Sequence, residues 1–290
     1  MNYAKLKYLC AMGIFGTIGI FVRYIPMSSA AIALCRGLLG FVFLAAFMLL
    51  TGKKPDIAAI RRNTVLLFCS GFAIGFNWVL LFESYKYTAV STATVCYYLA
   101  PLLLLLASPL LGERLTVKKF LCVGAALLGL VCVSGVIEKG IPSWSEIKGV
   151  AFGVGAAVLY ATVMFLNKKL SPIGAYDKTV IQLACSVLVV LPYLLVTEGL
   201  SAPNLRPVQW VLLLVVGILH TGIAYALYFS AMKGLNAQTI AVFSYLDPVI
   251  AVVLSALVLQ EPMQLSNIIG TVLILGSALY SQLPTKQKTD

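Results

Sequence analysis

The residues best placed to do chemistry are the few polar side chains inside otherwise apolar segments. Asp247 precedes Pro248, which has no N–H and therefore leaves the carbonyl of Ser244 without its helical partner. Ionisable groups at membrane depth are costly and usually functional. A carboxylate beside an opened backbone could bind a cationic group or a proton. It could equally be a buried acid that bonds neighbouring helices and maintains their packing.

His220 and Arg36 are two further ionisable side chains within apolar segments. An imidazole titrates near neutral pH, which suits proton coupling, but a neutral imidazole can also bridge two helices. We favour the bridging role unless His220 faces Asp247. Arg36 could hold a substrate carboxylate through a bidentate pair, or it could brace the carbonyls of an adjacent helix. For Arg36 we favour the structural role.

Aromatic and amide side chains are candidates for the walls of a central pocket. Tyr225 and Tyr228 are three residues apart and share one helical face. Aromatic walls can stack on flat solutes or hold quaternary cations, although packing alone explains any single tyrosine. Tyr160 is a further candidate of this kind. The predicted substrate-binding residues are Asn77, Trp78, Tyr97, Tyr98, His220, Tyr225, Tyr228, Ser244 and Asp247.

The composition indicates a membrane protein. Hydrophobic residues make up 61% of the 290 residues and charged residues only 11%, whereas a soluble domain carries about a quarter charged residues. A helix needs roughly 20 apolar residues to cross the hydrocarbon core. The sequence predicts an all-α integral membrane protein with ten transmembrane helices, at residues 8–22, 29–50, 63–82, 87–112, 120–137, 149–167, 179–197, 207–232, 237–260 and 262–285.

The placement of the basic residues predicts the topology. With a cytoplasmic N-terminus, fifteen Lys and Arg residues lie in inside segments, five lie in outside segments and Arg36 lies in a span. This bias is the positive-inside pattern of a protein with both termini cytoplasmic. The net charge of +11 therefore reflects membrane orientation, and we expect no nucleic-acid partner.

The two halves of the chain resemble each other. Residues 97–113 read YYLAPLLLLLASPLLGE and residues 244–261 read SYLDPVIAVVLSALVLQE. A five-helix unit has an odd number of spans, so the second copy must be inverted, a recurrent plan of secondary transporters. We predict a first repeat at residues 1–137, an extracytoplasmic linker at 138–148 and an inverted repeat at 149–290. Pro101 and Pro248 are predicted to break or gate helices, and Glu113 and Glu261 to be structural charges that cap the following helix or bind a loop.

These blocks carry a resemblance to a known family. The Leu-x-Pro blocks at residues 99–101 and 246–248, the Leu-Gly-Glu-Arg-Leu block at 111–115 and the glycine-rich openings at 13–19 and 149–157 resemble the EamA family of the drug/metabolite transporter superfamily. The likeness covers nearly the whole length. It implies export of amino acids or related metabolites. It also implies that a basic residue near Arg36 and an acid before Pro248 are common family features.

The expected function is a secondary transporter that exports a small organic solute, an amino acid or related metabolite, by alternating access. A drug or organic-cation exporter is the alternative, and a membrane-embedded lipid-acting enzyme or a channel is the rival of another class. The sequence has no Walker-type motif, and we expect no enzyme activity, cofactor or metal. We expect a multi-pass protein of the plasma or inner membrane, in contact with lipid, with a coupling proton or ion and a homodimer both possible.

Overall fold

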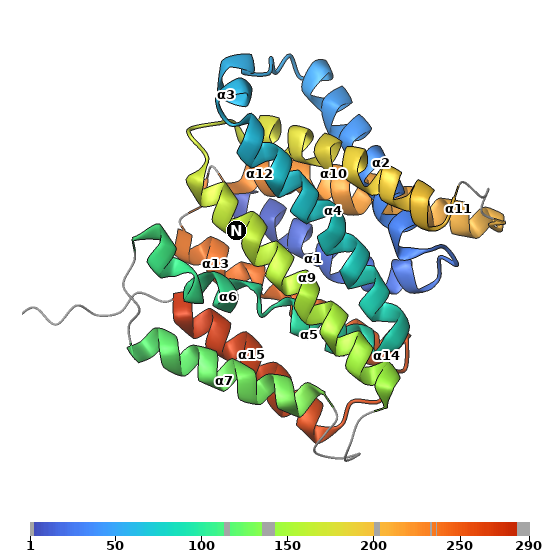
Figure 1. Cartoon of the computed structure of the whole chain (residues 1–290), viewed down its shortest axis with the longest axis vertical. Coiled ribbons are helices and arrows are strands. Elements are labelled where there is room, and N and C mark those ends of the chain that lie inside the picture. The colour runs from blue at the N-terminus through green and yellow to red at the C-terminus, as the bar shows by residue number, and fades with distance from the viewer. Residues whose placement is uncertain are drawn as a thin grey trace, which may run out of the picture.

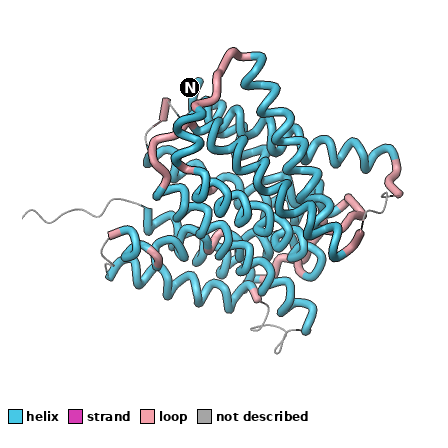
Figure 2. Tube along the Cα trace, turned by 45° about the horizontal axis from the view of Figure 1, so that its top comes forward, coloured by secondary structure: helices cyan, strands magenta, loops and turns pink. Residues whose placement is uncertain are grey.

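The computed structural model describes residues 3–112, 117–134, 143–199, 204–232, 234–235 and 237–282. Helices joined by short loops make up these residues, and no strand occurs among them (Figure 2). The all-helical class that the sequence predicts is therefore confirmed for the described chain. The count of ten spans and the side on which each terminus lies stay predictions.

Six helices are long and apolar enough to cross a membrane. Five of them are regular α-helices, whereas the sixth, Pro207–Ala231, contains a π-helical stretch. The regular ones are α1 (Tyr3–Arg23), α2 (Ser29–Leu50), α4 (Thr64–Tyr87), α9 (Trp144–Lys169) and α10 (Ala175–Thr197). The sixth is built from α11 (Pro207–Leu214), η2 (Val215–Ile223) and α12 (Ala224–Met232).

The spans that the sequence places at residues 87–112 and 237–260 are each divided into shorter helices. The first divides into α5 (Val90–Tyr97), α6 (Ala100–Leu106) and the 3-10 turn η1 (Ser108–Leu111). The second divides into α13 (Ala237–Ser244) and α14 (Leu246–Val258).

The two interruptions have the same backbone form and the same cause. Tyr98 has φ −74° and ψ 5°, and Tyr245 has φ −77° and ψ −3°. Each lies three residues before a proline, Pro101 or Pro248. Because proline has no N–H and crowds the preceding turn, the carbonyl four residues back loses its partner. That carbonyl belongs to the last residue of α5 in one half and of α13 in the other.

The remaining described helices are α3 (Ile57–Arg62), α7 (Val117–Val133) and α15 (Leu265–Gln282). The helix α3 is short and lies in the loop between α2 and α4, and Asp56 caps it by accepting from the N–H of Ala59 at 2.9 Å. Helices α7 and α15, one from each half, lie side by side at one edge of the bundle (Figure 1).

The two halves interlock instead of forming separate units. Helix α1 packs against α12 and α14 of the second half, and α9 packs against α4, α5 and α6 of the first half (Figure 1). Helix α2 packs on η2, and α10 packs on α4. Each of these contacts between halves recurs with the halves exchanged. The opening helix of each half therefore completes the core of the other.

Glycine allows a close backbone contact between α7 and α15. A Cβ atom on Gly270 would lie 2.6 Å from the carbonyl oxygen of Gly129, and one on Gly129 would lie 2.8 Å from the carbonyl oxygen of Gly270. The backbones of the two helices therefore touch where both residues lack side chains. Such close approach is how small residues drive helix association in lipid, where the hydrophobic effect between helices is absent.

Gly270→Ala should separate α7 from α15 and lower the melting temperature of the purified protein in detergent. Overpacking of this kind costs about 1–3 kcal/mol. Gly276→Ala in the same helix is the matched control, since a Cβ there meets no atom within 4 Å, and it should leave the melting temperature unchanged or slightly raised. Equal melting curves for the two variants would contradict the close contact.

Candidate functional site

The two interrupted helices meet through their side chains. The hydroxyl of Tyr98, at the interruption between α5 and α6, donates to Oδ2 of Asp247 near the start of α14 at 2.6 Å. Helices α5 and α14 pack directly on each other. The bond therefore links the interruption of one half to the interruption of the other. Asp247 and Tyr98, which sequence reasoning proposed separately, are direct partners.

Ser244 lies at the same interruption and bonds the first helix of the chain. Its Oγ donates to the carbonyl of Ile240 at 2.7 Å and lies 2.8 Å from the hydroxyl of Tyr8. The ring of Tyr8 lies 5.4 Å from the ring of Tyr228. Sequence reasoning missed Tyr8. Tyr8 and Phe15 are seven residues apart and share one helical face. This aromatic spacing was the feature of the sequence that could have pointed to Tyr8.

Tyrosines from four helices contact one another or the residues of the two interruptions. Tyr97 stacks on Tyr160 with centroids 5.1 Å apart and an interplanar angle of 17°, and Tyr97 is 5.9 Å from Tyr98. The ring of Phe15 lies 5.4 Å from that of Tyr225 and 6.3 Å from that of Tyr228. We call the following residues the tyrosine cluster: Tyr8, Tyr97, Tyr98, Tyr160, Tyr225 and Tyr228.

Several side chains of the tyrosine cluster keep accessible surface. Tyr160 keeps 38% of its surface exposed while its ring stacks on Tyr97. Tyr97, Tyr98 and Asp247 are each half-buried. These side chains therefore bond and stack on one another without being fully enclosed by the protein.

Arg36 on α2 lies near the tyrosine cluster but is held by other residues. Its Nε donates to Oγ1 of Thr221 at 2.9 Å, and its guanidinium lies 4.1 Å from the centroid of the Trp78 ring. Arg36 is only 6% exposed and Trp78 only 5%. The predicted structural role of Arg36 has a concrete form here, because the guanidinium joins α2 to η2 and α4. Trp78 therefore packs against Arg36.

His220 is fully buried and both of its ring nitrogens contact protein atoms. Nε2 lies 2.8 Å from Oγ1 of Thr17, and Nδ1 lies 3.2 Å from the carbonyl of Val215. The ring of Phe21 packs edge-on against it at 4.9 Å. The described contacts of His220 therefore join α1 to η2 and do not include Asp247. This is the bridging arrangement that sequence reasoning favoured.

The π-helical register of η2 sets the direction of two of these side chains. His220 bonds the carbonyl of Val215, and Thr221 donates to the carbonyl of Val216 at 3.3 Å, each five residues back. π-Helical turns are rare and occur often at functional sites. The sequence carried no visible signal for this register.

Asn77 is buried between α4 and α9. Its Nδ2 donates to the carbonyl of Ala156 on α9 at 2.5 Å, and the residue is 2% exposed. This bond joins α4 to α9 and leaves little surface for a ligand. Of the predicted binding residues, the structure brings Tyr97, Tyr98, Tyr225, Tyr228, Ser244 and Asp247 to the cluster.

Glu261 reaches across to the other half of the chain. Its carboxylate accepts from the backbone N–H of Val90 at 3.0 Å and of Ser91 at 3.5 Å, and also from the hydroxyl of Ser255. A negative charge at a helix N-terminus is stabilised by the helix dipole. Glu261 therefore caps α5. The sequence predicted that Glu261 caps the following helix, which is α15, or binds a loop. Glu113 lies outside the described residues.

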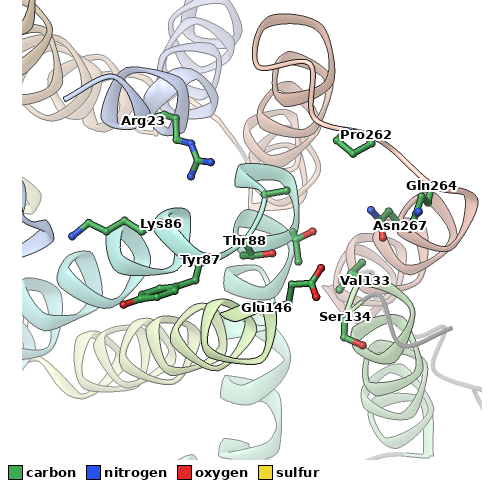
Figure 3. A pocket seen from close by; sticks show the side chains of 12 residues that line it. Arg23, Lys86, Tyr87, Thr88, Val133, Ser134, Glu146, Pro262, Gln264 and Asn267 are labelled. Atoms are coloured by element: carbon green, nitrogen blue, oxygen red, sulfur yellow. The ribbon is translucent and has the colours of Figure 1, made fainter. Parts of the chain in front are cut away.

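Two cavities lie away from the tyrosine cluster, at the ends of the helices that the charge pattern places outside. They have volumes of about 310 Å³ and 290 Å³, and both are lined by Arg23 and Lys86. Figure 3 shows Arg23, Lys86 and Glu146 around the first. Among the described residues, no group of three His, Cys, Asp or Glu side chains is placed to hold a metal ion.

Comparisons with known proteins show the family to which the chain belongs. The profile of the EamA-like transporter family matches twice, at residues 4–135 and 147–281. The uncharacterized transporter YxxF of Bacillus subtilis is 31% identical over 95% of this chain and 88% of its own length. An uncharacterized transporter of Archaeoglobus fulgidus is 24% identical over 97% of each chain. A protein of known crystal structure shares the fold, with a TM-score of 0.66, 18% identity, and 96% of this chain and 97% of that chain covered.

The membrane-length helices and these relatives define a multi-pass membrane transporter. The chain belongs to the EamA-like transporter family, which is part of the drug/metabolite transporter superfamily. The resemblance that the Leu-x-Pro and Leu-Gly-Glu-Arg-Leu blocks carry is confirmed.

Glu261→Ala should destabilise the protein by about 1–2 kcal/mol, the usual cost of losing a helix N-cap. The substitution leaves the N–H groups of Val90 and Ser91 without an acceptor and removes the partner of Ser255. The measurement is the melting temperature in detergent. Glu198→Ala, at an exposed acid after α10, is the control and should have no effect. A Glu261→Ala variant as stable as this control would contradict the capping role.

Proposed function

We propose that the chain is a secondary transporter that exports a small organic solute bearing an ammonium group, an amino acid or a related metabolite. The observation that carries the proposal is the Tyr98–Asp247 bond at 2.6 Å, which sets a carboxylate between the helix interruptions of both halves. A carboxylate there can bind a cationic group, and the tyrosine rings around it attract cations through their faces.

The carboxylate of Asp247 has capacity left for a ligand. Tyr98 occupies Oδ2, and no described residue hydrogen-bonds to Oδ1. Oδ1 of Asp247 is not one of the fully buried atoms that lack a partner in the described chain, which belong to Asp177 and Ser266. Oδ1 of Asp247 therefore keeps accessible surface. An ammonium group of the solute could therefore bond Oδ1 while Tyr98 holds the carboxylate in position.

Transport by alternating access between two inverted five-helix repeats is part of the proposal. Three observations support it: the helix contacts recur with the halves exchanged, the interruptions at Tyr98 and Tyr245 share one backbone form, and the family profile matches the chain twice. The bias of basic residues supports cytoplasmic termini in a plasma or inner membrane. The outward direction is inferred from the family resemblance alone.

A drug or organic-cation exporter is the second candidate function. The same carboxylate and aromatic walls would suit a cation that carries no carboxylate. The two candidates differ in whether the solute needs an anionic group.

Asp247→Asn should abolish saturable counterflow of amine-bearing solutes in proteoliposomes while preserving the fold. Asparagine can still accept the bond from Tyr98, but it lacks the charge that binds an ammonium group. Counterflow of radiolabelled amino acids is the measurement, with the melting temperature as the check on folding. Glu198→Gln is the control acid substitution and should transport normally. Full counterflow by the Asp247→Asn variant would sink the proposed role of this carboxylate.

Pro101→Ala and Pro248→Ala, made together, should slow transport more than they weaken binding. Alanine restores an N–H that the carbonyls of Tyr97 and Ser244 can accept, so each interrupted helix can straighten and resist bending. Binding by thermal stabilisation and flux by counterflow would be compared in the same preparation. Unchanged flux would show that the interruptions do not serve as hinges.

A further inference from the structure

Arg36 has two contacts that fix the plane of its guanidinium. Nε donates to Thr221 at 2.9 Å, and the ring of Trp78 lies 4.1 Å away. A second ring, that of Phe82, lies at 5.8 Å. Trp78 and Phe82 are almost fully buried. The arginine side chain therefore has one nitrogen engaged and its orientation set by aromatic packing.

The two terminal nitrogens of Arg36 are unused by the protein. In the part of the chain that the structure describes, neither Nη1 nor Nη2 has a hydrogen-bond partner, and the one ion pair found joins Lys86 to Glu83. Among the described residues, two fully buried side-chain atoms lack a hydrogen-bond partner, and they belong to Asp177 and Ser266. The unpartnered Nη1 and Nη2 of Arg36 therefore keep accessible surface. A guanidinium that is 6% exposed and has no anion beside it is costly within a membrane. An anionic ligand would offset that cost.

The free nitrogens belong to the same interior as the tyrosine cluster. Contacts connect Arg36 to Asp247 through η2 and α1: Thr221, which accepts from Arg36, follows His220, and His220 contacts Thr17 on α1. Beside Thr17, a Cβ atom on Gly16 would lie 2.6 Å from the carbonyl oxygen of Asp247. Arg36 and Asp247 nevertheless form no ion pair within 4.0 Å. A cation from α2 and an anion from α14 therefore lie in the same part of the helix bundle without forming an ion pair.

We propose that the terminal nitrogens of Arg36 bind the carboxylate of the transported solute, with Thr221 and Trp78 as positioning residues. A guanidinium presents two parallel N–H donors that match a carboxylate. The solute is then a zwitterion, with its carboxylate on Arg36 and its ammonium group on Asp247. This assignment rests on the proposed function, and it separates the amino-acid exporter from the organic-cation exporter.

The test compares each amino acid with its own amide, which keeps the ammonium group and the side chain but loses the negative charge. Purified full-length protein in detergent is titrated with L-phenylalanine, L-leucine, L-methionine and L-threonine and with the four amides, with thermal stabilisation as the readout. The wild-type protein should bind at least one acid about tenfold or more tightly than its amide, the worth of a charge-assisted pair.

Arg36→Gln should abolish this preference. Affinity for the acid should fall about tenfold or more, to the level of the amide, while affinity for the amide stays within about twofold of wild type. Asp247→Asn should instead weaken the acid and the amide alike, because both carry the ammonium group. Arg61→Gln, at an exposed arginine in α3, is the control and should change neither.

Three results would overturn the assignment: equal binding of acids and amides by wild type, no binding of any of the eight, or an Arg36→Gln variant that weakens both forms equally. Amine binding that depends on Asp247 but ignores the carboxylate would overturn the role of Arg36 and leave the proposed function intact. Should Arg36→Gln not fold, Thr221→Val replaces it. Losing the Nε partner should weaken the acid several-fold and spare the amide.

Discussion

Every irregular stretch of backbone at membrane depth must find its hydrogen bonds inside the protein, because lipid offers none. Pro101 and Pro248 each interrupt a helix, and the two interruptions lie where the halves of the chain meet. Helices from the opposite half cover them, α9 on α5 and α6, and α1 on α13 and α14. The exchange of opening helices between the halves is thus a direct consequence of interrupting two spans.

The same constraint explains where the polar contacts fall. The N-terminus of α5 begins at Val90 without a capping side chain of its own half, and Glu261 from the other half supplies the acceptor. Ser244 and Tyr8 bond each other where α13 ends. Polar side chains that hydrogen-bond to otherwise unpaired backbone groups also join the two halves. A movement of one half against the other must therefore exchange these contacts, which is the physical content of alternating access here.

The sequence predicted the features that hydropathy and local chemistry encode. Apolar runs located the long helices, and the proline at 248 together with the acid before it pointed to the polar interior. The pairing of Asp247 with Tyr98 could not be predicted, because the two residues are 149 positions apart and either could have faced elsewhere. Glu261 was predicted to cap the following helix or bind a loop, and its partner at Val90, 171 positions away, could not be predicted for the same reason. Hydropathy also treats residues 87–112 and 237–260 as continuous spans, since a break in hydrogen bonding leaves the apolar count unchanged. The use of Asn77 to bond Ala156 shows the remaining difficulty: an amide at membrane depth must bond something, and its partner was a distant carbonyl.

The separation of Arg36 from Asp247 is the last feature that requires a physical account. Two opposite charges 4 Å apart attract by about 4 kcal/mol at an effective dielectric constant of 20, so direct pairing would have relieved the cost of burying both. Instead Thr221 and Trp78 hold the guanidinium, and Tyr98 holds the carboxylate. Each charge is kept apart by contacts that the other half or a neighbouring helix supplies. A zwitterionic solute that bridged them would pair both charges at once, and its departure would leave both charges unpaired. Under the proposed assignment, the solute binds without first breaking an ion pair between Arg36 and Asp247.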